Sequence, residues 1–149
     1  KENISFSEIE IQKFTRKPLA LPEFFNLAKV NWFDEDFWIS NFNLDFTYFI
    51  YKNSNGFWPG LVLQLKPEKS QIVMDSQIRK IETGEDLFKL FITQPKERSG
   101  TFESVLISGE PARSLKLNSS DANFVYGWFH NYLVISTSLT GLGEAIKKL

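Results

Sequence analysis

The sequence has no cysteine. Without thiols the chain cannot form disulfides, thiolate zinc sites or a cysteine nucleophile. It also has no run of about 18 apolar residues, so no segment is predicted to span a membrane. Its 17 basic and 18 acidic residues give a net charge of −1. Nucleic-acid-binding proteins usually carry a basic excess, because phosphate contacts supply most of their affinity, so we expect no nucleic-acid partner.

Sequence motifs that carry chemistry are equally scarce. His130 is the only histidine, it falls at a predicted hairpin turn, and no G-x-S-x-G elbow offers it a serine nucleophile. Gly141 and Gly143 lack the further glycine or the Lys-Ser/Thr pair of a phosphate-binding loop. We therefore interpret His130 as a solvated turn residue. We expect no cofactor and no metal ion.

Aromatic residues are abundant, with 15 Phe, 4 Trp and 4 Tyr in 149 residues. Each buried ring removes a large apolar area from water, so a few elements can close a stable core. The sequence therefore predicts one folded domain over residues 1–149. Within it, residues 1–17 are a lead-in that either forms a strand or lies near a membrane, because Lys13, Arg16 and Lys17 gather at its end.

Strand signals are strongest between residues 44 and 65. Side chains alternate in character over residues 44–51, and Asn55-Gly56 is a strong hairpin signal before a return strand at 57–65. Pro59 cannot donate to a strand ladder, which predicts an edge or a bulge there. Turns are expected at 96–100 and 118–121. Further strands are expected at 4–14, 102–107, 113–117, 123–129 and 132–137.

Helix signals separate these strands. Pro22 suits the first turn of a helix whose buried side includes Phe24 and Phe25. Two more helices are expected, one after Pro67 and one ending near Pro95. The last helix has apolar residues at the spacing i, i+3, i+4 and i+7, and Ser138 or Thr140 can cap it. Its apolar stripe consists of Leu142, Ala145, Ile146 and Leu149.

This order of elements predicts an α+β fold, an antiparallel sheet of hairpins with helices packed on one face. A weak internal duplication is also suggested. Phe46-Thr47-Tyr48 opens one strand–turn–strand–helix unit, and Phe124-Val125-Tyr126 opens another.

The consecutive acids Asp34, Glu35 and Asp36 have two interpretations. As paired carboxylates they would serve a hydrolase, and their two pKa values would have to be pushed apart. As a helix start they would favour the positive end of the helix dipole, and this is the interpretation we prefer. They lack the spacing of a calcium loop.

Aromatic side chains are the candidate ligand-binding residues. Indole rings stack on the apolar faces of sugars or peptides. The candidates are Trp58, Trp128, Trp38 and Tyr126. Trp58 is expected to be the most exposed, because it lies beside Pro59 near a hairpin tip. The competing interpretation is that strand aromatics form the core.

The C-terminal residues 131–149, NYLVISTSLTGLGEAIKKL, resemble a strand–helix pattern of uncharacterised extracytoplasmic domains in bacterial membrane-anchored envelope proteins. The segment LALPEFFNLAKV at residues 19–30 is similar to one that precedes the first helix in some of them. The resemblance implies an extracytoplasmic accessory role and transfers no functional residues.

We therefore expect a non-enzymatic protein-interaction domain, exported and tethered through a signal or anchor before Lys1. It would bind a protein partner through an edge strand or an aromatic patch. A carbohydrate or cell-wall binding module is the first alternative, with a glycan as its partner. A carboxylate-dependent hydrolase is the second. The cell envelope is the expected location, although the composition is compatible with the cytoplasm as well.

Overall fold

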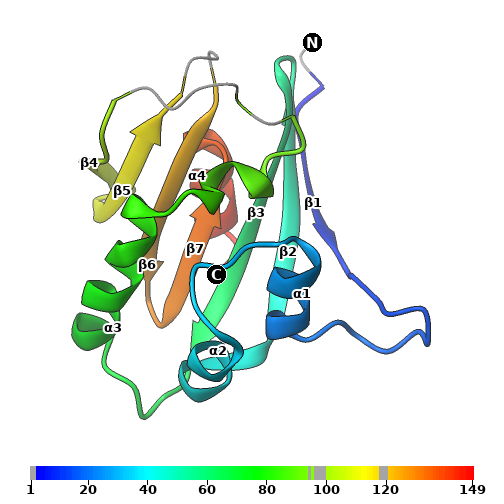
Figure 1. Ribbon diagram of the computed structural model, residues 1–149. Coiled ribbons are helices and arrows are strands. Elements are labelled where there is room, and N and C mark those ends of the chain that lie inside the picture. Colours follow the sequence, from blue (N-terminus) through cyan, green and yellow to red (C-terminus); the bar gives the residue numbers. More distant parts are fainter. Residues whose placement is uncertain (1–2, 94, 96–99, 118–120) are drawn as a thin grey trace.

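The computed structural model describes residues 3–93, 95, 100–117 and 121–149. Its centre is one antiparallel sheet of seven strands, in the order β1-β2-β3-β7-β6-β5-β4 (Figure 1). The expected α+β fold built from hairpins is confirmed. The turns expected at 96–100 and 118–121 lie largely outside the described residues. The strands are β1 (Ser5–Ile9), β2 (Phe42–Asn53), β3 (Gly56–Leu65), β4 (Glu103–Ile107), β5 (Glu110–Lys116), β6 (Asn123–Phe129) and β7 (Tyr132–Ser136).

Helices cover both faces of this sheet, which differs from the one-faced arrangement that the sequence predicted (Figure 1). One face carries all the helical elements except the last, and α4 lies on the other. The α-helices are α1 (Leu21–Leu27), α2 (Glu35–Asn41), α3 (Gln71–Ile78) and α4 (Leu139–Ile146), and the 3-10 helices are η1 (Arg79–Thr83) and η2 (Asp86–Leu90).

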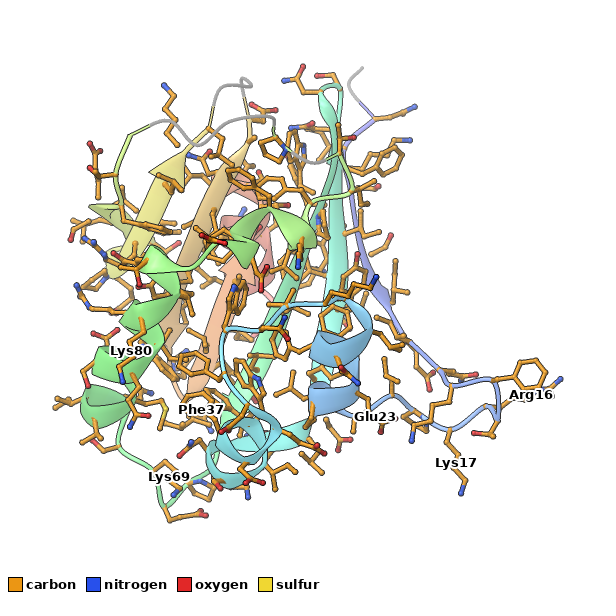
Figure 2. All side chains as sticks on the ribbon, in the orientation of Figure 1. Arg16, Lys17, Glu23, Phe37, Lys69 and Lys80 are labelled. Carbon is orange, nitrogen blue, oxygen red and sulfur yellow. The ribbon has the colours of Figure 1, made fainter. Side chains whose placement is uncertain are left out.

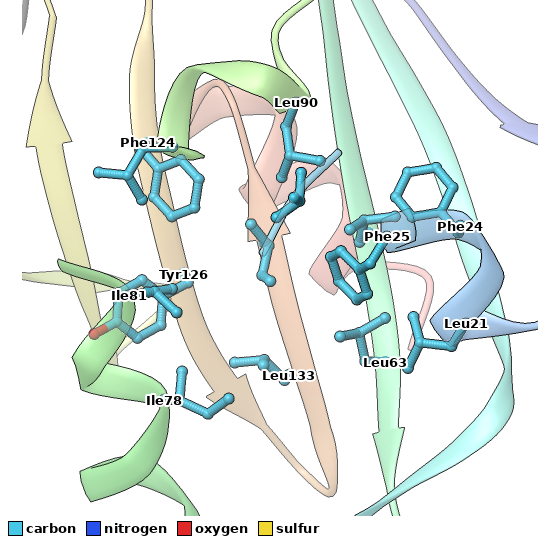
Figure 3. Close-up of a cluster of buried hydrophobic side chains, with 14 of the residues drawn as sticks. Leu21, Phe24, Phe25, Leu63, Ile78, Ile81, Leu90, Phe124, Tyr126 and Leu133 are labelled. Carbon is cyan, nitrogen blue, oxygen red and sulfur yellow. The ribbon is translucent and has the colours of Figure 1, made fainter. Parts of the chain in front are cut away.

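Successive side chains of the central strands point to opposite faces of the sheet, and this explains why two cores form. On β6, Phe124 and Tyr126 point toward α3, η1 and η2, while Val125 between them points toward α4. Both faces of β6 and β7 are therefore apolar, as expected for strands buried on both sides. Figure 3 shows the larger core, in which Phe25 and Leu63 meet on one side and Ile81 lies over Tyr126 on the other.

The suggested internal duplication applies to the two hairpins but not to the helices that follow them. Strands β3 and β7 pair antiparallel at the centre, so the hairpins β2–β3 and β6–β7 are related by a half-turn about the sheet normal. Such a rotation would keep both following helices on the same face. Because α3 and α4 lie on opposite faces, the strand–strand–helix unit is not repeated.

The lead-in is only partly a strand. Strand β1 ends at Ile9, whereas the sequence predicted a strand over residues 4–14. The chain then leaves the sheet and forms a small loop of its own, closed by a bridge between Gln12 and Pro18. This loop projects from the body of the molecule, with Arg16 and Lys17 near its end (Figure 2).

Pro59 lies in an interior strand of the sheet, but at the start of that strand, where β3 is not yet paired with β7, so the expected edge is a local one. Strand β3 pairs with β2 on one side and β7 on the other. Proline is tolerated because the paired part of β7 ends opposite Gly60, at Ser136. Beyond that point the Pro59 carbonyl accepts hydrogen bonds from the Thr137 backbone N–H and hydroxyl, and no N–H is needed from Pro59.

Ser138 caps α4, as one of the two expected candidates. Its buried hydroxyl accepts a hydrogen bond from the Gly141 N–H at 3.2 Å. We expect Ser138→Ala to lower the free energy of unfolding by about 1 kcal/mol, the usual cost of losing an N-cap. Ser70→Ala is the matched control, because the Ser70 cap of α3 is exposed and longer, at 3.5 Å, and should cost less. Urea denaturation of both variants measures the difference, and equal losses would contradict it.

Candidate functional site

A groove of about 300 Å³ runs between α3 and strands β4, β5 and β6, on the face of the sheet opposite α4. Tyr126 and Trp128 line it from β6, so the structure brings together two of the aromatic residues proposed for ligand binding. Arg113 and Ser104 line it from β5 and β4, and Arg79 lines it from the end of α3. Its volume is near the lower limit for small-molecule pockets.

A charged network lies beside the Tyr126 end of the groove. The Arg113 guanidinium donates two hydrogen bonds to the Glu82 carboxylate, from Nε to Oε1 at 2.8 Å and from Nη2 to Oε2 at 2.9 Å. The Tyr126 hydroxyl donates to Oε1 at 2.6 Å. The Arg113 Nη1 also donates to the Ser104 hydroxyl at 3.0 Å. This bidentate geometry is the strong form of an ion pair and fixes η1 to the sheet.

The pKa shifts of Glu82, Tyr126 and Arg113 make these groups poor general acids or bases near neutral pH. Burial raises the pKa of Glu82, but the hydrogen bonds from Arg113 and Tyr126 and the charge of Arg113 outweigh it, so the pKa is lowered. Burial, and then the neighbouring Glu82 carboxylate, raise the pKa of Tyr126 well above the ordinary range. Hydrogen bonding to Glu82 raises the pKa of Arg113. All three groups therefore stay in their usual charge state near neutral pH, and none is tuned for proton transfer.

Trp128 is the partly buried aromatic residue of the groove lining. It packs against the larger core, stacked on Phe42 with ring centroids 6.2 Å apart. Its indole nitrogen is buried and has no acceptor among the described residues. The indole N–H is therefore out of reach of a ligand in the groove.

The remaining aromatic candidates lie elsewhere and are buried. Trp58, expected to be exposed, is only 8% exposed, and its indole donates to the Asn53 side chain at 3.0 Å. Two residues beyond the turn, it pairs with Tyr51 and faces inward. Trp38 is 2% exposed and stacks on Phe25. The expectation of an exposed aromatic surface at Trp58 is therefore wrong, and the core interpretation of these rings is confirmed.

The acidic trio lies at the exposed start of α2. Asp34 is the N-cap, and its carboxylate accepts a hydrogen bond from the Phe37 N–H at 2.8 Å. Glu35 and Asp36 follow in the first turn, where the helix dipole favours negative charge. Asp34 and Glu35 border a pocket of about 260 Å³ between α1 and α2, together with Trp38. The helix-start interpretation is confirmed.

His130 lies in the turn between β6 and β7. His130 is exposed in the β6–β7 turn with a left-handed backbone (φ 58°), as the sequence predicted. The His130 carbonyl accepts a hydrogen bond from the Gln71 side chain, and the residue is not part of the groove lining. Among the described residues, no group of three or more His, Cys, Asp or Glu side chains could hold a metal ion.

Strand β4 forms the outer edge of the sheet beside the groove. A two-residue turn, Ser108-Gly109, joins it to β5, and both turn residues have positive φ. In such a hairpin the flanking pair, Ile107 and Glu110, is hydrogen-bonded, and bonded pairs then alternate along the ladder. The backbone N–H and C=O groups of Ser104 and Leu106 therefore point away from β5, toward the free edge.

The side chain of Leu106 reinforces this edge. It is 74% exposed, whereas its neighbours Val105 and Ile107 pack on the α4 side. By alternation, Leu106 and Ser104 face the same side as the groove, and Ser104 lines it. Within the described part of the chain, the outer side of β4 thus offers backbone groups without a strand partner and an exposed apolar side chain next to the groove.

Sequence reasoning placed a strand at 102–107 without identifying it as an edge. It also missed the Glu82–Arg113 pair, because 31 residues separate the two side chains. By contrast, the Asp75–Arg79 ion pair (3.0 Å) beside the groove had a signal in the sequence, namely its i, i+4 spacing on a helix.

Comparisons with protein-family models, with curated protein sequences and with solved structures return no match for this chain. Among the helices that the structure describes, none has the length and apolar character required to cross a membrane.

Proposed function

We propose that this chain is a non-enzymatic, extracytoplasmic protein-interaction domain that binds an extended segment of its partner at the β4 edge. The observation that carries this proposal is the free backbone edge of β4 with Leu106 exposed beside it. A partner strand added there would hydrogen-bond to Ser104 and Leu106, and pockets beside the sheet would select its alternate side chains. The location rests on the resemblance of residues 131–149 to envelope domains.

The groove supports this mode of binding. A strand paired with β4 would direct every second side chain toward the face that carries Leu106 and the groove. Arg79 is paired with Asp75, and Arg113 is paired with Glu82, so the groove has little unbalanced charge. We therefore expect a partner segment with an apolar residue beside Leu106 and polar residues near Arg113.

The opposite edge is a weaker candidate. Strand β1 has the same length as β4, five residues, but its side chains are mostly exposed and polar, and Ile9 is 40% exposed against 74% for Leu106. A pocket of about 220 Å³ touches β1 at Phe6 and Glu8, but its other lining residues come from the interior strands β2, β3 and β7 and from the C-terminal helical segment. The β1 edge therefore offers a partner strand less exposed apolar surface than the β4 edge does.

The burial of three of the four predicted aromatic residues, all except the partly buried Trp128, weakens the glycan-binding alternative. Sugar stacking requires an exposed ring face, and Trp58, Trp38 and Tyr126 are at most 8% exposed. Proton-transfer chemistry is likewise unsupported, because Glu82 and Tyr126 stay in their usual charge states and Asp34 caps a helix.

A random peptide library displayed on phage tests the proposal. We expect selection on the parent chain to enrich extended sequences, and Leu106→Pro to weaken the selected peptides about tenfold or more, because proline removes the outward N–H. Leu106→Thr is the matched control. It keeps the N–H and loses only the apolar contact, so its effect should be smaller.

Pairing between β4 and β5 does not use the Leu106 N–H, so both variants should keep the parent's far-ultraviolet circular dichroism and unfolding midpoint. Peptides that bind Leu106→Pro as tightly as the parent would contradict binding at this edge.

A further inference from the structure

The loop at residues 10–18 carries an aromatic ring that nothing in the fold buries. Phe14 has a relative exposure of 106%, the highest among the large hydrophobic side chains that the structure describes. The loop backbone is nevertheless closed by hydrogen bonds. The Lys13 N–H donates to the Lys17 carbonyl and the Arg16 N–H donates to the Lys13 carbonyl, both at 2.8 Å. The loop therefore presents Phe14 on a defined turn.

Basic residues lie on both sides of Phe14 in the sequence. Lys13, Arg16 and Lys17 flank Phe14, and residues 11–22 contain no acidic side chain, although the whole chain has a net charge of −1. The Lys13 ammonium lies 2.8 Å from the Glu23 carboxylate of α1 and ties the loop to the body. Arg16 and Lys17 extend away from the body (Figure 2). We call residues 13–17 the basic tip.

Arg16 also adopts a left-handed backbone conformation, with φ at 62°. Glycine or asparagine adopts this conformation at lower cost. The long cationic side chain of Arg16 lies at the outer end of the loop (Figure 2).

We propose that the basic tip docks the domain on an anionic lipid surface. Phe14 would insert at the boundary between headgroups and acyl chains, and Arg16 and Lys17 would contact lipid phosphates. An apolar ring among cations is the combination that binds such surfaces, because burial of the ring and attraction to anionic headgroups add together.

The shape of the tip favours lipid over a protein partner. A stable protein interface buries about 800 Å² on each side, which five residues of a convex loop cannot supply. A fluid lipid surface has no fixed shape and can close around a convex tip. The tip also follows β1, at the sheet edge opposite β4, so docking leaves the proposed peptide edge free.

Vesicle sedimentation tests this proposal. We expect the parent chain to bind vesicles of equimolar phosphatidylglycerol and phosphatidylcholine at low salt, and to bind pure phosphatidylcholine much more weakly. Phe14→Ala should lower the partition coefficient about tenfold, and the double variant R16A/K17A by a similar factor. The effect of R16A/K17A should shrink as salt rises, whereas that of Phe14→Ala should persist.

Phe57→Ala is the matched control. Phe57 is 52% exposed and has the Lys52 ammonium 5.3 Å from its ring centroid, but it lies at the β2–β3 turn. Its removal should leave vesicle binding unchanged. Phe14→Trp gives a second measurement, since its added emission should shift to the blue with anionic vesicles and remain unshifted with neutral ones.

Two outcomes would overturn the proposal. The first is absence of binding to anionic vesicles, or equal binding by the parent and Phe14→Ala. The second is tip variants that keep vesicle binding and lose the display-selected peptides, which would assign the tip to a protein interface. Leu106→Pro should bind vesicles like the parent, so failure of the peptide proposal and failure of the lipid proposal are separable.

Discussion

Gly60→Ala is expected to lower the free energy of unfolding by about 3 kcal/mol, and the thermal midpoint by roughly 6–12 °C. Gly60 lies opposite Phe49 in the β2–β3 ladder, and the Phe49 ring crosses directly over it. A Cβ at position 60 would lie 2.1 Å from the ring Cζ and 2.6 Å from the Ile135 carbonyl oxygen. The ring cannot easily move, since Phe49 is fully buried and stacks on Phe6.

Two further variants test whether the loss of stability comes from the contact between position 60 and the Phe49 ring. Gly143→Ala is the control, because nothing lies within 4 Å of a Cβ built at that position in α4. It should raise stability by about 0.5–1 kcal/mol, as glycine-to-alanine changes do in helices. Adding Phe49→Leu to Gly60→Ala should cost less than the sum of the two single changes, because the smaller side chain relieves part of the clash. A Gly60→Ala variant as stable as the parent would contradict the close approach of Phe49.

Glu82→Gln is expected to lower the free energy of unfolding by about 2–3 kcal/mol at pH 7. The change removes the counter-charge of Arg113 and turns an amide donor toward its guanidinium. The side chains of Glu82 and Arg113 are only 16% and 19% exposed, so water replaces the lost interactions poorly. Urea denaturation at several pH values measures the loss.

The loss should depend on pH with a definite sign. Because folding lowers the pKa of Glu82, its ionised form stabilises the fold above the ordinary glutamate range. That contribution disappears as pH falls through the ordinary range and then through the lowered folded value. The stability difference between the parent and Glu82→Gln should therefore be constant near neutral pH and shrink in acid.

Glu144→Gln is the control for this experiment. Glu144 pairs with Lys147 at 2.8 Å on the exposed surface of α4, where such pairs contribute about 0–1 kcal/mol. Its substitution should change stability little at any pH. A Glu82→Gln loss that is small at pH 7, or unchanged in acid, would show that the network does not fix η1 to the sheet.

Local rules predicted much of the fold. The hairpin at residues 53–56, the Ser138 cap, the Asp34 helix start and the exposed turn at His130 each depend on a few adjacent residues, and all four are confirmed. In that hairpin Ser54 and Asn55 form the turn, and Gly56 pairs with Asn53. Alternation on β2 was also correct. Phe46 packs against Phe24 of α1, while Phe49 faces α4.

Non-local packing decided what the sequence could not predict. Pro59 is acceptable in an interior strand only because β7 ends beside it, which depends on residues far along the chain. Trp58 is buried although it follows a turn, because its ring packs into the larger core. The apolar stripe of α4 does not specify which face of the sheet the helix covers. It covers the face that carries Phe49 and Val134, because those side chains complete its core.

The candidate site shows the same division. Tyr126 and Trp128 were chosen as aromatic residues and do share a groove, but the charged partners that define it come from η1 and β5. The Glu82–Arg113–Tyr126 network could not be predicted, because Glu82 lies 31 residues from Arg113 and 44 residues from Tyr126 in the sequence. The features on which the proposed binding mode depends, the β4 backbone and the exposed side chain of Leu106, follow from which strand is outermost, and the sequence does not specify this.

Amide hydrogen exchange with a display-selected peptide tests the central claim most directly. The Ser104 and Leu106 amides point outward on β4 and should exchange quickly in the free domain, then become strongly protected when the peptide pairs with them. Protection should spare the Ser5–Ile9 strand. New protection on β1, or unchanged exchange at both β4 amides in the complex, would contradict a partner strand on this edge.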